Sequence, residues 1–377
     1  MEPDQVATDP GSALAISPDW RALVDRLGLS YFACPDWIVA WWETIADGAE
    51  GEVAVWRDRN GSPEAVVSLA RRGERLHGRA PVAIPVWTNM GSGAGAADHC
   101  AFAIATRRSG DVHVWLVRRA RGRPLLLRDL DPEVGVRGVP PGSRLVARTP
   151  CPRLEIPDGD EEVGRSSNFR QQLQSSRHRA DRAGVRFRWI APGEMTADVL
   201  EILLELHTRR RASLGLGTSF DRGRLTFHRR LIELGEGVRG PAAVIAERNG
   251  AAVGVLYGFL WRNVFAYYQS GWDPSLERIR LGYLLIAHAI GSSREAGARW
   301  FDLLRGVEPY KYRFGAFDRI DETWLLPSGP AGALLHATFR AKQWMAGESI
   351  GPRTVEHQRP GSGDHGLSVR AGSRRSS

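Results

Sequence analysis

Five side chains that can exchange protons or hold an anion fall within ten residues of one another. They are Asp302, Arg305, Glu308, Tyr310 and Lys311. The apolar run 300–304 predicts a short buried strand, which Gly306 and Pro309 end. These polar groups therefore gather at the C-terminal end of a strand, the edge at which open α/β sheets bind ligands. Lysine is also rare in this chain, occurring only as Lys311 and Lys342.

A second polar pair ends the glycine-rich stretch 91–99. Glycines at alternate positions could let backbone amides wrap an anion, but a lone GxGxG pattern is weak, and a connecting loop is the favoured interpretation. Asp98 and His99 stay candidates for contact with a substrate.

Arginine dominates one predicted helix. Between residues 165 and 188 there are seven arginines against one acid, and Asn168 and Gly184 are the expected helix caps. The favoured interpretation is a solvated surface helix, and the alternative is an anion-binding face for a phosphorylated ligand or an RNA backbone. In the next helix, His207 lies where the face passes from apolar to basic, and a structural role is favoured there too.

Composition limits the class of protein. With 377 residues, 42% of them hydrophobic and 25% charged, the chain is an ordinary globular protein. Three widely spaced cysteines without a CxxC pair indicate neither a disulfide framework nor a zinc site, and we expect no metal. The apolar region 251–268 is interrupted by Arg262 and Asn263, so it predicts paired strands and not a transmembrane helix. Acidic residues 1–10 do not suit a secretory signal, so we expect a cytoplasmic protein.

Patterning predicts a mixed α/β (α+β) protein of two domains. We expect a flexible N-terminus at 1–12, domains at 13–157 and 158–346, and a disordered basic tail at 347–377. Three prolines at 150–157 predict an extended connection between the domains.

The first domain is expected to contain two helices and a hairpin about Asn60-Gly61. Trp37, Trp41 and Trp42 of its second helix are expected in the core. Its other predicted strands are 81–88, 112–117, 125–127 and 145–146. In the second domain, after the arginine-rich helix, we expect a strand at 185–190, helices at 196–211 and 225–234, strands at 242–248, 251–261 and 264–270, a helix at 281–296, strands at 300–304 and 323–326, and a helix at 331–344.

Several segments of this second domain form a recognisable combination. They are the arginine-rich helix 169–184, Leu206-His207 followed by Arg209-Arg210, Gly271-Trp272-Asp273-Pro274 before Gly282, and Phe301-Asp302 through Gly306 to Tyr310-Lys311. The combination resembles the GNAT acyltransferase fold. In detail it resembles the CelD-like, BioF-associated acetyltransferase branch related to the FemABX peptidyltransferases, which pair two GNAT-like halves. The resemblance covers about residues 15–345, and the C-terminal domain matches better.

The resemblance implies transfer of an acyl group from acyl-CoA to an amine or hydroxyl by direct attack in a ternary complex. The acceptor would be a small molecule, a sugar or a cell-envelope precursor. Of the catalytic candidates, Asp302 and Glu308 would orient or deprotonate the nucleophile, directly or through water. Tyr310 or Tyr268 would donate to the leaving sulfur, and Lys311 or Arg305 would hold a phosphate, a carboxylate or the developing negative charge. The implied substrate-binding residues are His207, Arg210, Tyr268 and Arg305.

The resemblance also places the donor. GNAT enzymes bind the pyrophosphate of CoA with R/Q-x-x-G-x-G/A at a helix N-terminus. Gly282 fits the first glycine, but this chain has Ile279 and Leu284 at two of the other motif positions. The implied cofactor-binding residues are Arg278, Arg280, Gly282 and Tyr283. Because the motif differs from that of the family at these positions, a longer acyl-CoA, an acyl carrier protein or an aminoacyl-tRNA remain alternatives to acetyl-CoA. We expect no nucleic acid as a partner other than this tRNA. A non-catalytic GNAT-like binding module is the other alternative.

Overall fold

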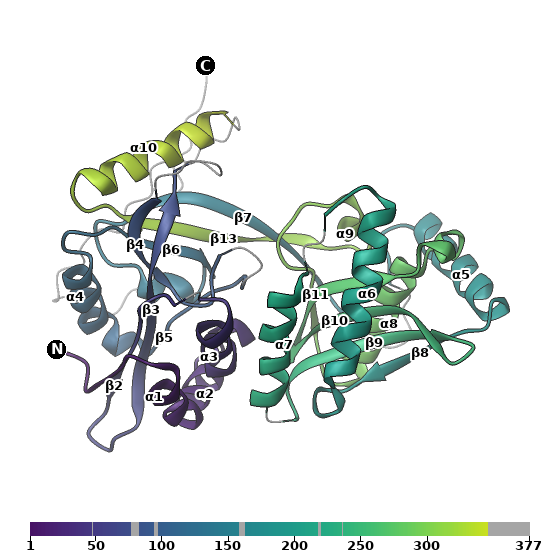
Figure 1. Ribbon diagram of the computed structural model, residues 1–377, viewed down its shortest axis with the longest axis horizontal. Coiled ribbons are helices and arrows are strands. Elements are labelled where there is room, and N and C mark those ends of the chain that lie inside the picture. The colour runs from purple at the N-terminus through teal and green to yellow at the C-terminus, as the bar shows by residue number, and fades with distance from the viewer. Residues whose placement is uncertain are drawn as a thin grey trace.

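One mixed β-sheet runs through both halves of the chain (Figure 1). The computed structural model describes residues 1–46, 48–76, 83–93, 97–157, 163–217, 220–235 and 237–345. The strands are β1 (Gln5–Ala7), β2 (Gly51–Arg57), β3 (Pro63–Arg75), β4 (Ala83–Asn89), β5 (Ala103–Ile104), β6 (Leu125–Leu130), β7 (Arg144–Glu155), β8 (Val185–Ile190), β9 (Gly240–Arg248), β10 (Ala251–Trp261), β11 (Val264–Trp272), β12 (Trp300–Asp302) and β13 (Phe317–Leu326).

The strand order in the described part of the chain is β1-β2-β3-β4-β6-β13-β7-β12-β11-β10-β9-β8, with β5 paired to β3. The pairs β4–β6 and β11–β12 are parallel, and the other strand pairs are antiparallel. β13 comes from the C-terminal half but lies between β6 and β7. The long strands β7 and β13 cross from one lobe to the other in Figure 1. Backbone hydrogen bonds therefore join the two halves.

Helices cover both faces of the sheet. They are α1 (Pro10–Ala15), α2 (Ser17–Arg26), α3 (Pro35–Thr44), α4 (Ser109–Arg119), α5 (Ser167–Arg182), α6 (Ala197–Ser213), α7 (Arg222–Leu234), α8 (Leu281–Glu295), α9 (Pro309–Arg313) and α10 (Gly329–Met345). Short 3-10 helices lie at Tyr31–Ala33, Thr106–Arg108, Gly135–Gly138, Pro192–Glu194 and Pro274–Ile279.

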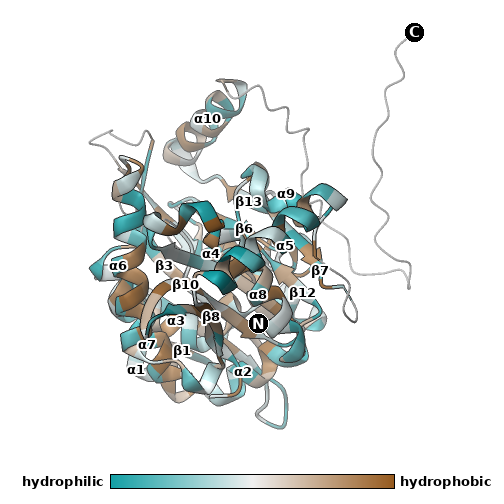
Figure 2. Cartoon of the chain, turned by 90° about the vertical axis from the view of Figure 1, so that its right-hand side faces the viewer, coloured by the Kyte–Doolittle hydropathy of each residue, from teal (hydrophilic) through white to brown (hydrophobic). Residues whose placement is uncertain are grey.

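Two large hydrophobic clusters lie on opposite faces of the C-terminal strands. One joins α3, α6 and α7 to alternate residues of β10 such as Tyr257 and Phe259, and the other joins α5 and α8 to Leu256 and Leu260. In Figure 2 the helices around the sheet carry hydrophobic beside hydrophilic residues, as helices with one buried face do. A third cluster packs Leu335 of α10 on β4, β6, β7 and β13. The C-terminal helix thus completes the core of the N-terminal lobe.

The predicted mixed α/β class is confirmed, and so are the buried tryptophans of α3. The strand predicted at 112–117 is wrong, because these residues belong to α4. Val112, Trp115 and Leu116 are buried while Val114 and Val117 are exposed, which is the spacing of a helix.

The N-terminal segment, which is expected to be flexible, contains secondary structure. The segment 1–12 contains β1, which pairs with β2, and the start of α1, which the Asp9 side chain caps. The predicted tail 347–377 lies outside the described residues. Of the described helices, none combines the length and the apolar character that crossing a membrane would require.

Candidate active site

Two neighbouring cavities share one wall in the C-terminal half of the fold. The cavity beside the first residues of α8, here the α8 cavity, has a volume of about 510 Å³. The second lies beside residues 303–308, which follow β12 and are here called the β12 turn. This β12 cavity has a volume of about 420 Å³. Tyr267, Gln269 and Tyr310 line both cavities. The two cavities are therefore neighbours at these three side chains.

The α8 cavity is lined by groups that attract anions. Arg210 and Arg211 of α6 line it together with Arg280, and Glu277 is the acid in its wall. α8 begins directly after Arg280, which has a left-handed backbone (φ 56°), and no side chain of the described residues caps its first turn. The amide groups of a first helical turn lack partners within the helix and carry a partial positive charge. The α8 cavity therefore suits a phosphate.

Arg210 has the least satisfied side chain in this wall. Its Nε and one terminal nitrogen are buried and have no hydrogen-bond partner among the described residues. Its guanidinium lies over the ring of Trp272, 4.7 Å from the centroid. The adjacent Arg209 is instead half-exposed and pairs with Glu205. An arginine stays charged when buried, so unused donors on Arg210 favour an anionic ligand.

Gly282 makes room for the side chain of Trp272. A Cβ atom added there would lie 2.9 Å from the Trp272 ring, so the glycine permits close packing of that indole on α8. Tyr283 lines the same cavity, and its hydroxyl accepts a hydrogen bond from Arg313 at 3.2 Å. Gln172 of α5 accepts hydrogen bonds from both Arg280 and Arg313. Arg278, which was predicted to bind the cofactor, is exposed and is not among the residues that line the α8 cavity.

Lys311 fastens the β12 turn. Its ammonium group donates to the carbonyl oxygens of Leu304 at 3.0 Å, Arg305 at 2.7 Å and Gly306 at 3.1 Å. It also lies 3.0 Å from Oε2 of Glu308, and the residue is 2% exposed. All the protons of the ammonium group are therefore engaged within the turn. Lys311 borders the β12 cavity, but its charge is already neutralised and directed at the backbone.

Tyr310 lies at the shared wall in a short chain of hydroxyl groups. Its hydroxyl is hydrogen-bonded to that of Tyr267, which lies 2.5 Å from Oγ of Ser270. Burial raises the pKa of Tyr310, and the neighbouring Tyr267 and Glu308 raise it further. Burial also raises the pKa of Tyr267. Both phenols are protonated at neutral pH and can give a proton to a developing anion.

Both basic and acidic side chains line the β12 cavity. Arg224 of α7, Tyr268 and Arg305 line it, and so does Glu308, whose side chain is 55% exposed. Burial raises the pKa of Tyr268, so this hydroxyl is also protonated. Glu308 is the accessible carboxylate among the residues that line this cavity, because Asp98 there is buried against Arg305.

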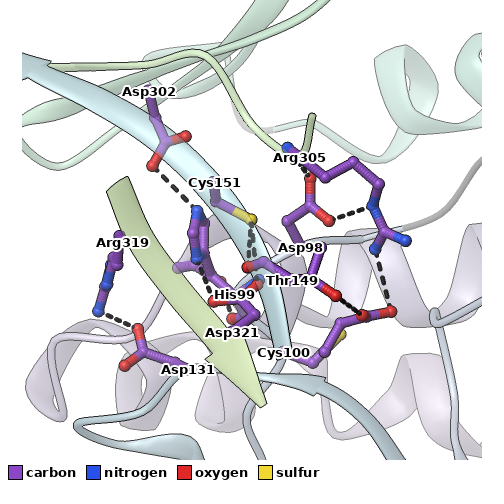
Figure 3. A network of polar contacts seen from close by, with 12 residues as sticks. Asp98, His99, Cys100, Asp131, Thr149, Cys151, Asp302, Arg305, Arg319 and Asp321 are labelled. Carbon is purple, nitrogen blue, oxygen red and sulfur yellow. Dashed lines mark hydrogen bonds and ion pairs between the residues drawn. The ribbon is translucent and has the colours of Figure 1, made fainter. Parts of the chain in front are cut away.

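Asp302 is placed differently from the expectation, in a buried network at the junction of the two lobes (Figure 3). Its Oδ1 accepts the N–H of Leu304 at 2.8 Å, and its Oδ2 lies 3.0 Å from Nε2 of His99. The Nδ1 of His99 lies 2.8 Å from Asp321. Asp302 is 3% exposed and does not line the α8 or the β12 cavity. It holds the β12 turn from outside these two cavities.

Charge balance keeps His99 protonated. Burial lowers the pKa of His99, but the carboxylates of Asp302 and Asp321 outweigh burial, and the pKa lies well above its usual value. Burial raises the pKa of Asp302, but the charge of His99 outweighs it, and the pKa is lowered. The network therefore contains an imidazolium between two carboxylates that come from β12 and β13.

Arg305 joins this network to the cavity. Its Nε donates to Asp98 at 2.5 Å, and a terminal nitrogen lies 3.0 Å from Asp129. Burial lowers the pKa of Arg305, but Asp98 and Asp129 outweigh burial and raise it. His99, Asp129 and Leu304 all have positive φ angles, of 52°, 52° and 55°. Such conformations are costly for residues other than glycine, and the ionic contacts hold them in place.

His207 is buried away from both cavities. Its Nδ1 lies 2.9 Å from the carbonyl oxygen of Ser270, which joins α6 to β11. Burial lowers the pKa of His207. Tyr267 and Gln269 were missed as site residues. They lie within β11, just beyond Ala266, which pairs with Asp302 at the end of the parallel strand β12, and polar side chains beside the end of a parallel strand were the available signal.

His99, Cys151 and Asp321 could be read as a metal site, because one ligand atom from each lies within 4.8 Å of the others. Each ring nitrogen of His99, however, faces a carboxylate oxygen at hydrogen-bonding distance. An imidazolium in this position has no lone pair to offer a metal ion. The donor set as arranged fits an ion-pair network better than a metal centre.

Comparison with known proteins identifies the fold. Residues 167–312 match the family model of the acetyltransferase (GNAT) domain. No curated protein matches the sequence. Among solved structures, the chain is similar to FemX, with a TM-score of 0.57 and 9% identity over 82% of this chain and 95% of that one. The L-PGS of Bacillus licheniformis has a TM-score of 0.52 and 10% identity over 88% and 96%.

A third similar structure is the C-terminal domain of an Agrobacterium fabrum protein assigned as a lysylphosphatidylglycerol synthetase. Its TM-score is 0.57, with 12% identity over 89% of this chain and 98% of that one. Identities this low establish the fold alone. The GNAT-superfamily, FemABX-related fold is thereby confirmed.

Proposed function

We propose that this chain, which has a GNAT-superfamily fold related to FemX, is an acyltransferase that moves an acyl group from acyl-CoA to an amine or hydroxyl acceptor. The observation that carries the proposal is the shared wall of Tyr267, Gln269 and Tyr310 between two cavities of different character. Two substrates bound in one complex could react there directly, without a covalent intermediate on the protein.

The donor would occupy the α8 cavity. Arg210 and Arg280 would bind its phosphates together with the first amides of α8, and the unused donors of Arg210 are the strongest support. The thioester carbonyl would then lie toward the shared wall. The bulk of Trp272 over Gly282 means that the phosphate would approach beside this indole and not across the glycine face.

The acceptor would occupy the β12 cavity, as a small molecule, a sugar or an envelope precursor. An alkyl amine has a pKa of about 10.4, so it must lose a proton before attack. Glu308 would take that proton directly or through water. The nitrogen would then bond to the acyl carbon, and the carbon–sulfur bond would break as Tyr310 protonates the departing thiolate. The second proton that the nitrogen loses on becoming an amide would restore Tyr310, through the hydroxyls of Tyr267 and Ser270 or through water. Arg224 would attract an anionic group of the acceptor, whereas the guanidinium of Arg305 is already paired with Asp98 and Asp129.

A specific observation favours a second donor, an aminoacyl-tRNA, which the FemABX resemblance also implies. Arg165 before α5, Arg182 within it, and Arg186 and Arg188 of edge strand β8 are exposed. Such a basic surface suits a polyphosphate backbone, and binding through it weakens steeply as salt rises.

Binding measurements separate these donors. Acetyl-CoA, a long-chain acyl-CoA and unfractionated tRNA would be titrated into the wild type, Arg210→Met and Arg209→Met at two salt concentrations. We expect saturable acyl-CoA binding that weakens about tenfold or more in Arg210→Met, because a charged hydrogen bond contributes about 1.5–3 kcal/mol. Arg209→Met serves as the control and should bind as the wild type does.

Turnover would then be followed as thiol release against a panel of amines, since all three cysteines are buried. Salt-sensitive tRNA binding without acyl-CoA binding would transfer the assignment to aminoacyl transfer. Binding of neither would contradict both donors and favour a non-catalytic module or a carrier-protein donor.

A further inference from the structure

The C-terminal helix α10 is apolar on two opposite faces. One face packs Leu335 and Phe339 on β4, β6, β7 and β13, and Gln343 donates a hydrogen bond to the carbonyl oxygen of Val146 on the same side. The other face points away from the sheet, and Figures 1 and 2 both show α10 at the periphery of the molecule. A helix that covers a core needs one apolar face, so the second face calls for another explanation.

The outer face carries a row of exposed apolar side chains, here called the α10 stripe. Its members are Leu334, Ala337, Ala341, Trp344 and Met345, which recur at spacings of three or four residues and so lie along one side of the helix. Leu334 is 51% exposed, Met345 66% and Trp344 83%. Isolated exposed apolar residues are ordinary, whereas a continuous row on one element marks a contact surface.

The charges beside the α10 stripe are all of one sign. Arg340 and Lys342 are exposed, and they directly precede and follow Ala341, so they project from the two sides of the stripe. The sequence 329–345 contains no aspartate or glutamate. Among the described residues, no carboxylate lies within ion-pairing distance of Arg340 or Lys342. The stripe is therefore an apolar row between two basic borders.

This charge pattern favours one kind of partner. In a symmetric contact with a second copy, the same basic borders would approach each other and repel. Residues 346–377 hold five arginines against three acids, and their large apolar residues stand singly between polar residues and glycines, so they complement neither the stripe nor its borders. A surface of anionic lipids complements both, because it offers an apolar layer beneath a layer of phosphate groups.

We propose that the α10 stripe docks the protein on a membrane surface that contains anionic lipids. The helix lies along the surface, Leu334, Trp344 and Met345 enter the boundary between headgroups and acyl chains, and the two cations reach the lipid phosphates. The contact is peripheral and reversible, since three large side chains bury little apolar surface. It is independent of the acyl-transfer assignment, because no residue of α10 lines the α8 or the β12 cavity.

Flotation of the full chain with lipid vesicles tests the proposal. Vesicles of equal parts phosphatidylglycerol and phosphatidylcholine are compared with vesicles of phosphatidylcholine alone. The wild type is expected to bind the anionic vesicles more tightly and to be released as salt rises. Trp344→Ser should weaken this binding about tenfold or more, because it removes the largest apolar side chain of the stripe. The double variant Arg340→Gln, Lys342→Gln should weaken it about 30-fold, the usual effect of two cations near an anionic surface.

Two control variants separate the stripe from other surfaces. Val238→Ser removes an exposed apolar side chain outside α10, and Arg186→Gln, Arg188→Gln removes two exposed cations of β8. Both controls should bind the anionic vesicles as the wild type does. All the substituted side chains are exposed, so every variant should keep the melting temperature of the wild type.

Several results would overturn the proposal. No flotation of the wild type, or equal flotation of Trp344→Ser, would exclude a lipid contact of the stripe. Loss of binding in Arg186→Gln, Arg188→Gln alone would assign the lipid contact to β8. A dimer in sedimentation velocity that Trp344→Ser dissociates would assign the stripe to a second copy. A lower melting temperature of Trp344→Ser without vesicles would mean that residues 346–377 cover the stripe.

Discussion

Replacing Lys311 by Met tests whether this lysine fastens the β12 turn or reacts with substrate. The ammonium group donates to three backbone carbonyl oxygens and pairs with Glu308 in a site that is 2% exposed. Met retains much of the apolar stem but leaves these carbonyls without their charged donor. Leu304, whose φ is positive, loses the contact that holds its carbonyl.

The magnitude follows from these contacts. Each carbonyl left unsatisfied costs about 1–3 kcal/mol, so three cost roughly 3–9 kcal/mol. Removing a buried ammonium group recovers several kcal/mol of its desolvation cost. We therefore expect the free energy of unfolding to fall by about 3 kcal/mol, whereas removing an exposed reactive lysine would change it by less than about 0.5 kcal/mol.

Urea unfolding of the wild type, Lys311→Met and Lys342→Met gives the comparison. Lys342 is the other lysine of the chain and is exposed on α10, so its replacement controls for the loss of one positive charge. A loss below about 0.5 kcal/mol in Lys311→Met would refute the reasoning. Amine acetylation of the native wild type gives an independent check: Lys342 should be modified and Lys311 protected.

Three further outcomes are expected. Tyr310→Phe should lower kcat about 100-fold with little change in stability, as loss of a general acid does, whereas Tyr312→Phe should not; equal activities would contradict the role of the shared wall. His99→Asn, which tolerates the positive φ, should cost about 3–5 kcal/mol, because it leaves two buried carboxylates without their cation. Since the folded pKa of His99 is raised, its stabilisation is complete below pH 6.5 and is lost as pH rises through that folded pKa. Urea unfolding from pH 6 to pH 9.5 should therefore show a decline in the wild type that is absent from His99→Asn, and parallel profiles would exclude His99 as the cause. Gly282→Ala places a Cβ 2.9 Å from Trp272, so it should shift tryptophan fluorescence and weaken donor binding, and an unchanged donor affinity would show that the indole does not shape the α8 cavity.

Local patterns predicted most of the C-terminal elements. The helix expected at 196–211 is α6, and the strands expected at 251–261 and 264–270 are β10 and β11. Their side-chain periodicity and turns are properties of neighbouring residues, so they can be read without the fold. The same reasoning failed for 112–117, where Val and Trp have high strand propensity but the buried positions follow a helical repeat.

The sequence by itself determined that polar side chains gather after the strand at Trp300, and it determined the approximate position of the helix that begins beside Gly282. Only the tertiary structure decided what those side chains do. Lys311 bends back onto its own turn, and Asp302 turns to His99, which also binds Asp321, 222 residues further along the chain. A residue's charge is visible in the sequence, but its partner depends on which strands become neighbours. Here β13 returns from the end of the chain to lie between β6 and β7, and this crossing brings the buried carboxylates to the junction of the two lobes.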